Sequence, residues 1–220
     1  KDTMLKSNRP VIAVCAVRTG SGKSQTSRKV IELLKKQGLR AIVVRHPMPY
    51  GELARQRMQR LAQLGDLKKH NCTIEEIEEY EPHLVRGTIV YAGADYLAIL
   101  KAAEKDPEGC DVIVWDGGNN DFPFIKPDWE IVLVDALRPG HEKLYYPGEV
   151  NLRRADLLII TKVNEGKKES LNQIRESISR SNPAAKVMET SSLIEVDHPE
   201  WIEGPKGYAG VAEEPAERQT

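Results

Sequence analysis

Apolar, β-prone runs alternate with helical periodicity along most of this chain. The strongest runs have no polar face, which is typical of strands buried on both sides of a parallel sheet. Strands are expected at 11–16, 39–44, 88–92, 111–115, 130–134, 156–160 and 185–188. Because helical segments separate them, the pattern predicts an α/β fold with a mostly parallel sheet and helices on both faces.

Helical patterns occupy most of the intervals between these runs. Helices are expected at 23–37, 51–67, 73–81, 95–105, 151–154 and 167–181. Thr73 and Glu76 have the spacing of a capping box, and Pro82 is expected to end the helix that they begin. Tyr145–Glu149, which holds a proline and a glycine, is expected to form a rigid loop.

A length of 220 residues fits one domain with a sizeable core. Residues 1–10 are polar without periodicity and are expected to be a linker, and residues 11–203 form the expected domain. An insertion is expected at about 68–87, where a lid or substrate loop would lie. Residues 204–220 turn to Gly, Pro, Ala and Glu, which indicates a flexible tail.

The charged residues are balanced, with 32 Lys and Arg against 33 Asp and Glu. This balance argues against a nucleic-acid or anionic-membrane partner and favours small molecules. Cys15, Cys72 and Cys110 form no C-x-x-C pair, which indicates reduced, structural thiols and a cytoplasmic protein. No apolar run approaches the roughly 18 residues that a membrane span requires.

The first strand breaks into a glycine loop that leads directly into a helix. Gly20 and Gly22 permit positive φ, and a helix N-terminus favours a bound anion. Lys23 can reach β- and γ-phosphate oxygens, and the Ser24 hydroxyl can ligate Mg²⁺. Val17 stands where the usual P-loop pattern begins with glycine, so the motif deviates by one residue. The expected nucleotide-binding residues of this loop are Thr19, Gly20, Ser21, Gly22, Lys23, Ser24 and Gln25.

An acidic group follows the fourth strand. Asp116 is expected to hold Mg²⁺ opposite Ser24, directly or through water, and Gly117 and Gly118 would let the chain pass a γ-phosphate. Lys23 and Asp116 therefore form the predicted catalytic centre. One of three polar residues beside the acid is expected to orient a nucleophile or coordinate the metal through water: Asn119, Asn120 or Asp121.

Basic residues follow several strands at the same edge. Arg18 is a further catalytic candidate that would neutralise transition-state charge in its own site or across a homodimer. The alternative is an exposed loop arginine. Two basic pairs are expected to bind an anionic substrate. The alternative for the first pair is a surface turn, and the alternative for the second pair is that its side chains cap local carbonyl groups. The pairs are Arg45 with His46 and Arg138 with His141.

The strand at 156–160 leads to residues that bear on the choice of base. Lys162 and Asn164 stand where P-loop GTPases carry an Asn-Lys-x-Asp motif. Lys162 fits that role, but the Asn164 amide offers one acceptor where guanine presents two donors. The sequence therefore favours ATP, or a loose choice of base.

Three residues within the insertion raise the question of a metal site. His70, Cys72 and His83 could converge on zinc, but they lack a recognised ligand spacing. We favour a solvated acidic helix in this segment over a zinc site.

Specific residue runs accompany the P-loop, namely Arg45–Gly51, His70–Glu76, Trp115–Asp121 and Arg138–His141. With them the chain resembles, from about residue 1 to 203, a prokaryotic family of GTPases often labelled cyclic 2,3-diphosphoglycerate synthetase. The resemblance implies a three-layer, deviant P-loop NTPase fold and the central domain of a longer protein. It also implies an ATP-dependent ring closure, in which the nucleotide activates one phosphate of 2,3-diphosphoglycerate and the other phosphate attacks it.

From these residues we predict a Mg²⁺-dependent P-loop NTPase that transfers a phosphoryl group from ATP to an anionic, phosphorylated small molecule. The first alternative is a regulatory or metallochaperone GTPase that acts as a nucleotide-dependent switch. The second alternative is a structural module that binds nucleotide without turning it over.

Overall fold

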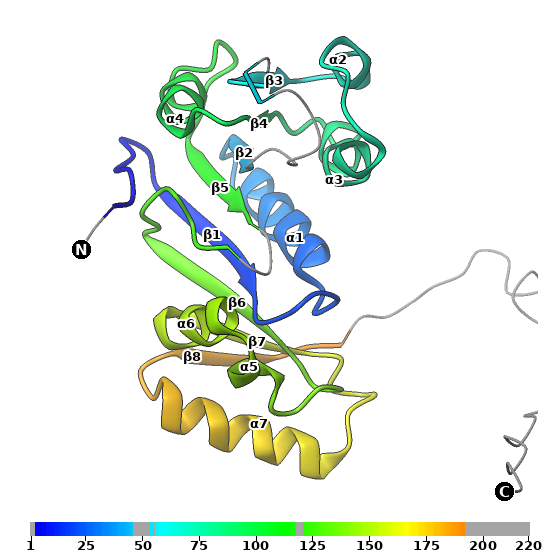
Figure 1. Ribbon diagram of the computed structural model, residues 1–220, viewed down its shortest axis with the longest axis vertical. Helices are drawn as coiled ribbons and strands as arrows, with labels where there is room; N and C mark the ends of the chain where they lie inside the picture. Colours follow the sequence, from blue (N-terminus) through cyan, green and yellow to red (C-terminus); the bar gives the residue numbers. More distant parts are fainter. Residues whose placement is uncertain (1–2, 46–52, 55, 118–120, 192–220) are drawn as a thin grey trace, which may run out of the picture.

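The computed structural model describes residues 3–45, 53–54, 56–117 and 121–191 (Figure 1). Within these residues eight strands form one sheet in the order β3-β4-β2-β5-β1-β6-β7-β8. Neighbouring strands are parallel except β3 and β4, which are antiparallel. The strands are β1 (Val11–Ala16), β2 (Ala41–Arg45), β3 (Gln59–Leu61), β4 (Val90–Ala92), β5 (Val112–Asp116), β6 (Trp129–Asp135), β7 (Leu157–Thr161) and β8 (Lys186–Glu189).

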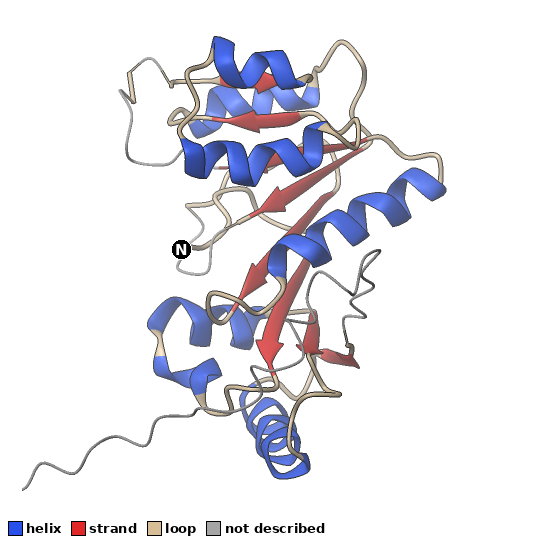
Figure 2. Cartoon of the chain, turned by 90° about the vertical axis from the view of Figure 1, so that its right-hand side faces the viewer, coloured by secondary structure: helices blue, strands red, loops and turns tan. Residues whose placement is uncertain are grey.

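Helices lie on both faces of this sheet, as the two views in Figures 1 and 2 show. The mostly parallel α/β prediction is therefore confirmed. The helices are α1 (Lys23–Lys36), α2 (Leu64–Lys69), α3 (Ile74–Leu84), α4 (Tyr96–Glu104), α5 (His141–Leu144), α6 (Tyr146–Arg154) and α7 (Lys168–Ser181).

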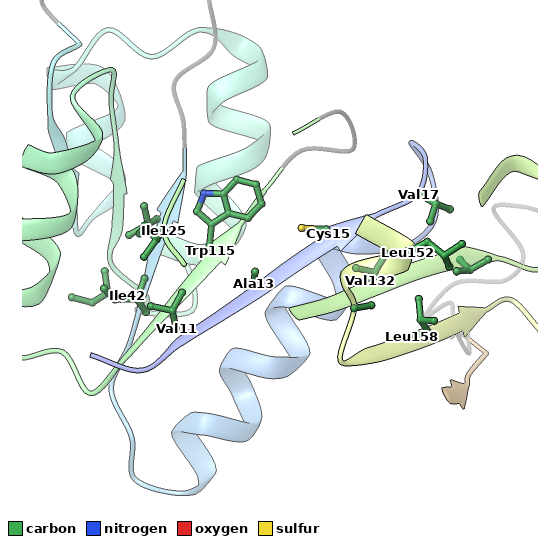
Figure 3. Packing of buried hydrophobic residues seen from close by; sticks show 14 of the residues in the cluster. Val11, Ala13, Cys15, Val17, Ile42, Trp115, Ile125, Val132, Leu152 and Leu158 are labelled. Carbon is green, nitrogen blue, oxygen red and sulfur yellow. The ribbon is translucent and has the colours of Figure 1, made fainter. Parts of the chain in front are cut away.

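Each face of the sheet carries its own hydrophobic cluster, because successive residues of a strand point to opposite sides of the sheet. Cys15 and Trp115 belong to the cluster that packs against α4, α6 and α7, and we call this side the α4 face. Figure 3 shows part of this cluster around β1. Val14 and Val114 belong to the cluster that packs against α1, α2 and α3, which we call the α1 face.

The prediction of a helix at 51–67 is wrong for most of the residues in that range that the structure describes. Gln59–Leu61 forms β3, which pairs with β4 at the edge of the sheet, and α2 begins only at Leu64. Gln59 and Leu61 are buried while Arg60 is less so, which is the alternation of a half-buried strand. Pairing with β4 therefore overrides the helical preference of the segment.

Two expected boundaries near prolines also need correction. The capping box is confirmed, because the Glu76 amide donates to Thr73 Oγ1 at 3.2 Å, but α3 continues through Pro82 to Leu84. Proline removes one backbone donor, and burial of the flanking residues on the α1 face offsets that loss. The expected loop at Tyr145–Glu149 mostly lies in α6, where Pro147 occupies the first turn that favours proline.

Residues 3–10, expected as a linker, pack against the domain. The Leu5 amide donates to the Phe124 carbonyl oxygen at 2.8 Å, and the Ser7 hydroxyl donates to Glu104 at 3.0 Å. The expected tail at 204–220 lies outside the described residues. Among the helices that the structure describes, none has the length and apolar character needed to span a bilayer.

Candidate functional site

The phosphate loop joins β1 to α1 at the carboxyl edge of the sheet. Gly20 and Gly22 have φ values of 81° and 89°, as expected for a loop that requires the left-handed region. Gly22 is the N-cap residue of α1 and has no side chain to cap the helix. The amides at this helix start therefore face no N-cap side chain, which suits them to an anionic ligand.

Side chains from β7 and its end hold the loop in place. Thr161 Oγ1 donates to the Ser21 carbonyl oxygen at 3.0 Å. Lys162 Nζ donates to the Gly20 carbonyl oxygen at 2.8 Å and pairs with Asp135 Oδ2 at the same distance. The Lys162 ammonium thus stabilises the loop, and its stem remains the part that could lie against a base. The backbone amide of Asn164 donates to the Ser191 hydroxyl at 3.1 Å.

Two of the predicted catalytic residues, Lys23 and Asp116, are in direct contact, although the sequence placed Asp116 opposite Ser24 and assigned Lys23 to the phosphates. Lys23 Nζ lies 2.8 Å from Asp116 Oδ1, and the Asp116 side chain is 0% exposed. The other oxygen, Oδ2, accepts from Arg45 Nη1 at 3.2 Å and from His83 Nε2 at 3.1 Å. Burial alone would raise the pKa of Asp116, but Arg45, His83 and Lys23 together hold that pKa well below its usual range. The carboxylate is therefore ionised and fully engaged.

Arg45 occupies a different position from the one expected for a substrate contact. Its side chain is 3% exposed and lies between Asp116 Oδ2 and Glu79 of α3, with which it forms a second ion pair. Its buried Nε has no hydrogen-bond partner among the described residues. Through Nη1 the guanidinium is thus committed to the centre of the site, where it pairs with two carboxylates. His46, its expected partner, lies outside the described residues.

His83 belongs to this centre, although its sequence context suggested only a possible zinc ligand. It is buried and reaches Asp116 from α3. Its spacing from Tyr80 and Leu84 places it on the buried face of the helix, and this periodicity was the available signal. The contact with Asp116 itself is long-range, and no local pattern predicts it.

The zinc alternative finds no support in the structure. His70 Nε2 contacts the Arg60 carbonyl oxygen at 3.2 Å, whereas His83 faces Asp116. Across the described part of the chain, no three His, Cys, Asp or Glu side chains gather to hold a metal. The acidic helix α3 is solvated on one face only, because Glu76, Tyr80, His83 and Leu84 are buried.

The donor set at the phosphate loop is compatible with Mg²⁺. In phosphate sites this ion takes one or two protein oxygens and completes its shell with phosphate and water. Ser24 follows Lys23 in the first turn of α1. Asp116 Oδ1 is engaged by Lys23, so direct ligation requires Lys23 to exchange this oxygen for a phosphate. Metal binding by Ser24 and Asp116 stays a prediction.

Gly117 is required by packing against Trp115. A Cβ at this position would lie 1.6 Å from the Trp115 ring, which is fully buried on the α4 face. The chain can therefore turn after Asp116 only because residue 117 has no side chain. Gly118, Asn119 and Asn120 lie outside the described residues.

The remaining basic residues divide into two groups. Arg18 Nη1 donates to His141 Nδ1 at 3.4 Å, and Arg18 Nε donates to the Thr19 carbonyl oxygen at 3.0 Å. These two candidates thus lie together beside the phosphate loop. Arg138 instead donates to the neighbouring Leu137 carbonyl oxygen at 3.3 Å, which is the local capping considered above.

Gly148 of α6 packs directly on the start of the phosphate loop. A Cβ here would lie 2.4 Å from the Val17 carbonyl oxygen. Within a helix, alanine is usually more favourable than glycine by about 1 kcal/mol. We nevertheless expect Gly148→Ala to destabilise the protein by about 1–3 kcal/mol, because the added methyl group would overpack the contact with Val17. Urea unfolding monitored by circular dichroism would measure the change.

Gly65 in α2 provides the matched control, because a Cβ there would meet nothing within 4 Å. We expect Gly65→Ala to stabilise the protein by up to about 1 kcal/mol. Equal free energies of unfolding for Gly148→Ala and Gly65→Ala would show that Gly148 is not closely packed against the phosphate loop.

Comparison with known proteins agrees with this geometry. Residues 86–191 match the family model described as cyclic 2,3-diphosphoglycerate synthetase, P-loop domain. Arginine synthetase ArcE of Thermococcus kodakarensis is 56% identical over 204 residues, covering 93% of this chain and 45% of that protein. A cyclic 2,3-diphosphoglycerate synthetase of Thermococcus sibiricus is 33% identical over 88 residues, covering 40% of this chain and 20% of that protein. The chain thus spans less than half the length of either relative.

A solved structure extends the comparison to the fold. LpxK from Aquifex aeolicus, in complex with ATP, superposes with a TM-score of 0.53, covering 93% of this chain and 77% of that chain. At 18% identity this likeness shows the fold alone, which is that of P-loop NTPases. The geometry of the site and the match to the family model agree. Residues 86–191 of this chain are similar to the P-loop domain of cyclic 2,3-diphosphoglycerate synthetases.

Proposed function

We propose that this chain is the nucleotide-binding and phosphoryl-transfer part of an ATP-dependent synthetase. One observation carries the proposal: Lys23 of the phosphate loop meets the buried Asp116 carboxylate of the strand β5 at 2.8 Å. A buried carboxylate that needs cationic partners keeps the lysine in place. An arriving triphosphate would offer the ammonium an alternative set of oxygens.

The described residues have complementary roles in this proposal. The phosphate loop and the start of α1 bind the phosphates, and Lys23 neutralises the developing charge. Arg18 and His141 lie beside the loop and can approach the transferred group. Mg²⁺, bound with the help of Ser24 and Asp116, would supply further neutralisation of phosphate oxygens. Arg45 and His83 keep the Asp116 carboxylate ionised and oriented.

The comparisons change the preferred acceptor. The match to a protein named arginine synthetase covers most of this chain, whereas the match to a cyclic 2,3-diphosphoglycerate synthetase covers 40% of it. A synthetase of arginine must place a third nitrogen on the carbon of the guanidinium group. Transfer of the terminal phosphate of ATP to the ureido oxygen of citrulline would turn that oxygen into part of a good leaving group. Ammonia would then attack the ureido carbon and release inorganic phosphate, which leaves arginine. We therefore prefer citrulline to 2,3-diphosphoglycerate as the acceptor.

A nucleotide-dependent switch is the second candidate. It is favoured by the contacts of His83 and Glu79 with the centre of the site, because both residues belong to α3 in the insertion. Loss of the Lys23 contact on nucleotide binding would change the charge that faces this helix. The preference for ATP, a cytoplasmic location and a homodimer remain predictions. The three free thiols are consistent with the predicted location.

The test combines binding and turnover. We expect the chain to bind ATP more tightly than GTP in the presence of Mg²⁺, as measured by isothermal titration calorimetry. Phosphate release from ATP should increase at least about tenfold with citrulline and ammonium, and not with 2,3-diphosphoglycerate. Stimulation by 2,3-diphosphoglycerate alone would reverse the choice of acceptor. Absence of binding of either nucleotide would contradict the proposal.

A further inference from the structure

We propose that an aromatic pocket on the α4 face binds the acceptor as an amino acid with a planar end. This inference rests on the proposed function and assigns the acceptor subsite. The pocket has a volume of about 400 Å³ and lies between the starts of α4 and α6. Its rings are Tyr96, Phe122, Phe124 and Tyr146, and Arg154 lies at its margin. A cavity of this size suits a small ligand.

The rings form two pairs with defined geometry. Tyr96 and Phe124 are stacked with centroids 3.9 Å apart and planes at 4°. Phe122 and Tyr146 meet edge to face at 6.0 Å. Tyr96 is 42% exposed and Tyr146 is 74% exposed, so much of this aromatic surface faces solvent. Exposed aromatic surface beside a cavity is typical of a binding site.

One contact attaches the pocket to the phosphate loop. Gly148, two residues after Tyr146, packs against the Val17 carbonyl oxygen at the start of that loop. Phe124 meets the Trp115 ring edge to face at 6.4 Å on the α4 face, whereas Asp116, the next residue of β5, points to the α1 face. The segments that carry the rings follow β4, β5 and β6, so the pocket lies toward the carboxyl edge of the sheet that also carries the phosphate loop.

The polar groups of the pocket indicate the chemical class of the ligand. Arg154 lies eight residues after Tyr146 in α6, which is about 12 Å along the helix axis. Its Nη2 pairs with the buried Glu130 Oε2 at 3.0 Å, which fixes the guanidinium at that end of the pocket. Aromatic faces attract the guanidinium cation of arginine, and the neutral ureido group of citrulline is planar and can pack flat against the same rings. A carboxylate near Arg154 and a planar end among the rings would match an extended arginine or citrulline.

Calorimetric titration of the full chain with arginine, and separately with citrulline, tests this assignment. We expect Tyr146→Ala and Phe122→Ala to weaken binding of both amino acids at least about tenfold, while Tyr146→Phe keeps the affinity because it keeps the ring. Leu97→Ala is the control, because this exposed residue of α4 does not line the pocket. The high exposure of Tyr146 means that its replacement should leave the fold intact, which circular dichroism would check.

The result separates this inference from the proposed function. ATP binding should be unchanged in all four variants, and Lys23→Ala should lose ATP while it keeps arginine binding. Unchanged arginine affinity in both alanine variants would overturn the pocket assignment. So would failure of the unaltered chain to bind either amino acid, even if it binds ATP. If the chain binds 2,3-diphosphoglycerate and the two alanine substitutions weaken that binding, the pocket does not select an amino acid and the proposed ligand class is wrong.

Discussion

Replacement of Lys23 by alanine is expected to lower ATP turnover at least about 100-fold, because the variant loses the cation that neutralises the transferred phosphate. The same change should reduce stability by about 1–3 kcal/mol, since it removes one of three partners from a fully buried carboxylate. Phosphate release and urea unfolding would measure the two effects separately.

A second substitution separates these roles. Asp116→Asn in the Lys23→Ala background removes the uncompensated charge, and we expect it to restore part of the lost stability but none of the turnover. Lys29→Ala on the exposed face of α1, where Lys29 pairs with Glu32, is the control and should change neither quantity appreciably. Turnover that survives in Lys23→Ala would argue that the loop does not act on the phosphates.

Replacement of Arg45 by methionine is expected to have the largest effect on stability, with a loss of about 3–5 kcal/mol. Arg45 is nearly fully buried and pairs with both Asp116 and Glu79, so its removal leaves two carboxylates with fewer cationic partners. Methionine keeps much of the side-chain volume, so the loss reports mainly on the charge. Urea unfolding followed by circular dichroism would measure the free-energy change.

Arg57→Met is the matched control. The Arg57 side chain is 74% exposed and pairs with Asp95 near the surface, and such pairs contribute less than about 1 kcal/mol. If Arg45→Met were no more destabilising than Arg57→Met, Arg45 would not be a structural ion-pair partner. A large loss of acceptor binding with unchanged stability would then favour its expected role as a substrate contact.

Much of the fold could be predicted from the sequence because its signals are local. The apolar run that becomes β1, the glycine loop and the amphipathic pattern of α1 are contiguous, and each residue type limits its own backbone. The capping box of α3 is a contact across three residues. Predictions failed where a distant strand or a packed helix face supplied the stabilisation, as in β3 and at Pro82.

The candidate site divides in the same way. Lys23 and Asp116 could be assigned to one site in advance, because parallel strands bring their carboxyl ends to one edge and each residue follows its own strand. Their direct ion pair was not predicted. His83 and Glu79 come from an insertion whose docking depends on burial against the α1 face. Arg45 could be placed at the edge of the sheet from sequence, but its direction toward Asp116 could not.

The amino-acid sequence by itself determined seven of the strands and most of the helices between them, the phosphate loop and the acid at the end of β5, because these features depend on residues close together in the chain. Only the tertiary structure decided that Asp116 is surrounded by Lys23, Arg45 and His83. It also decided that rings from three separate segments form one pocket. Both outcomes depend on which distant surfaces pack together, and that is set by the burial of the whole chain.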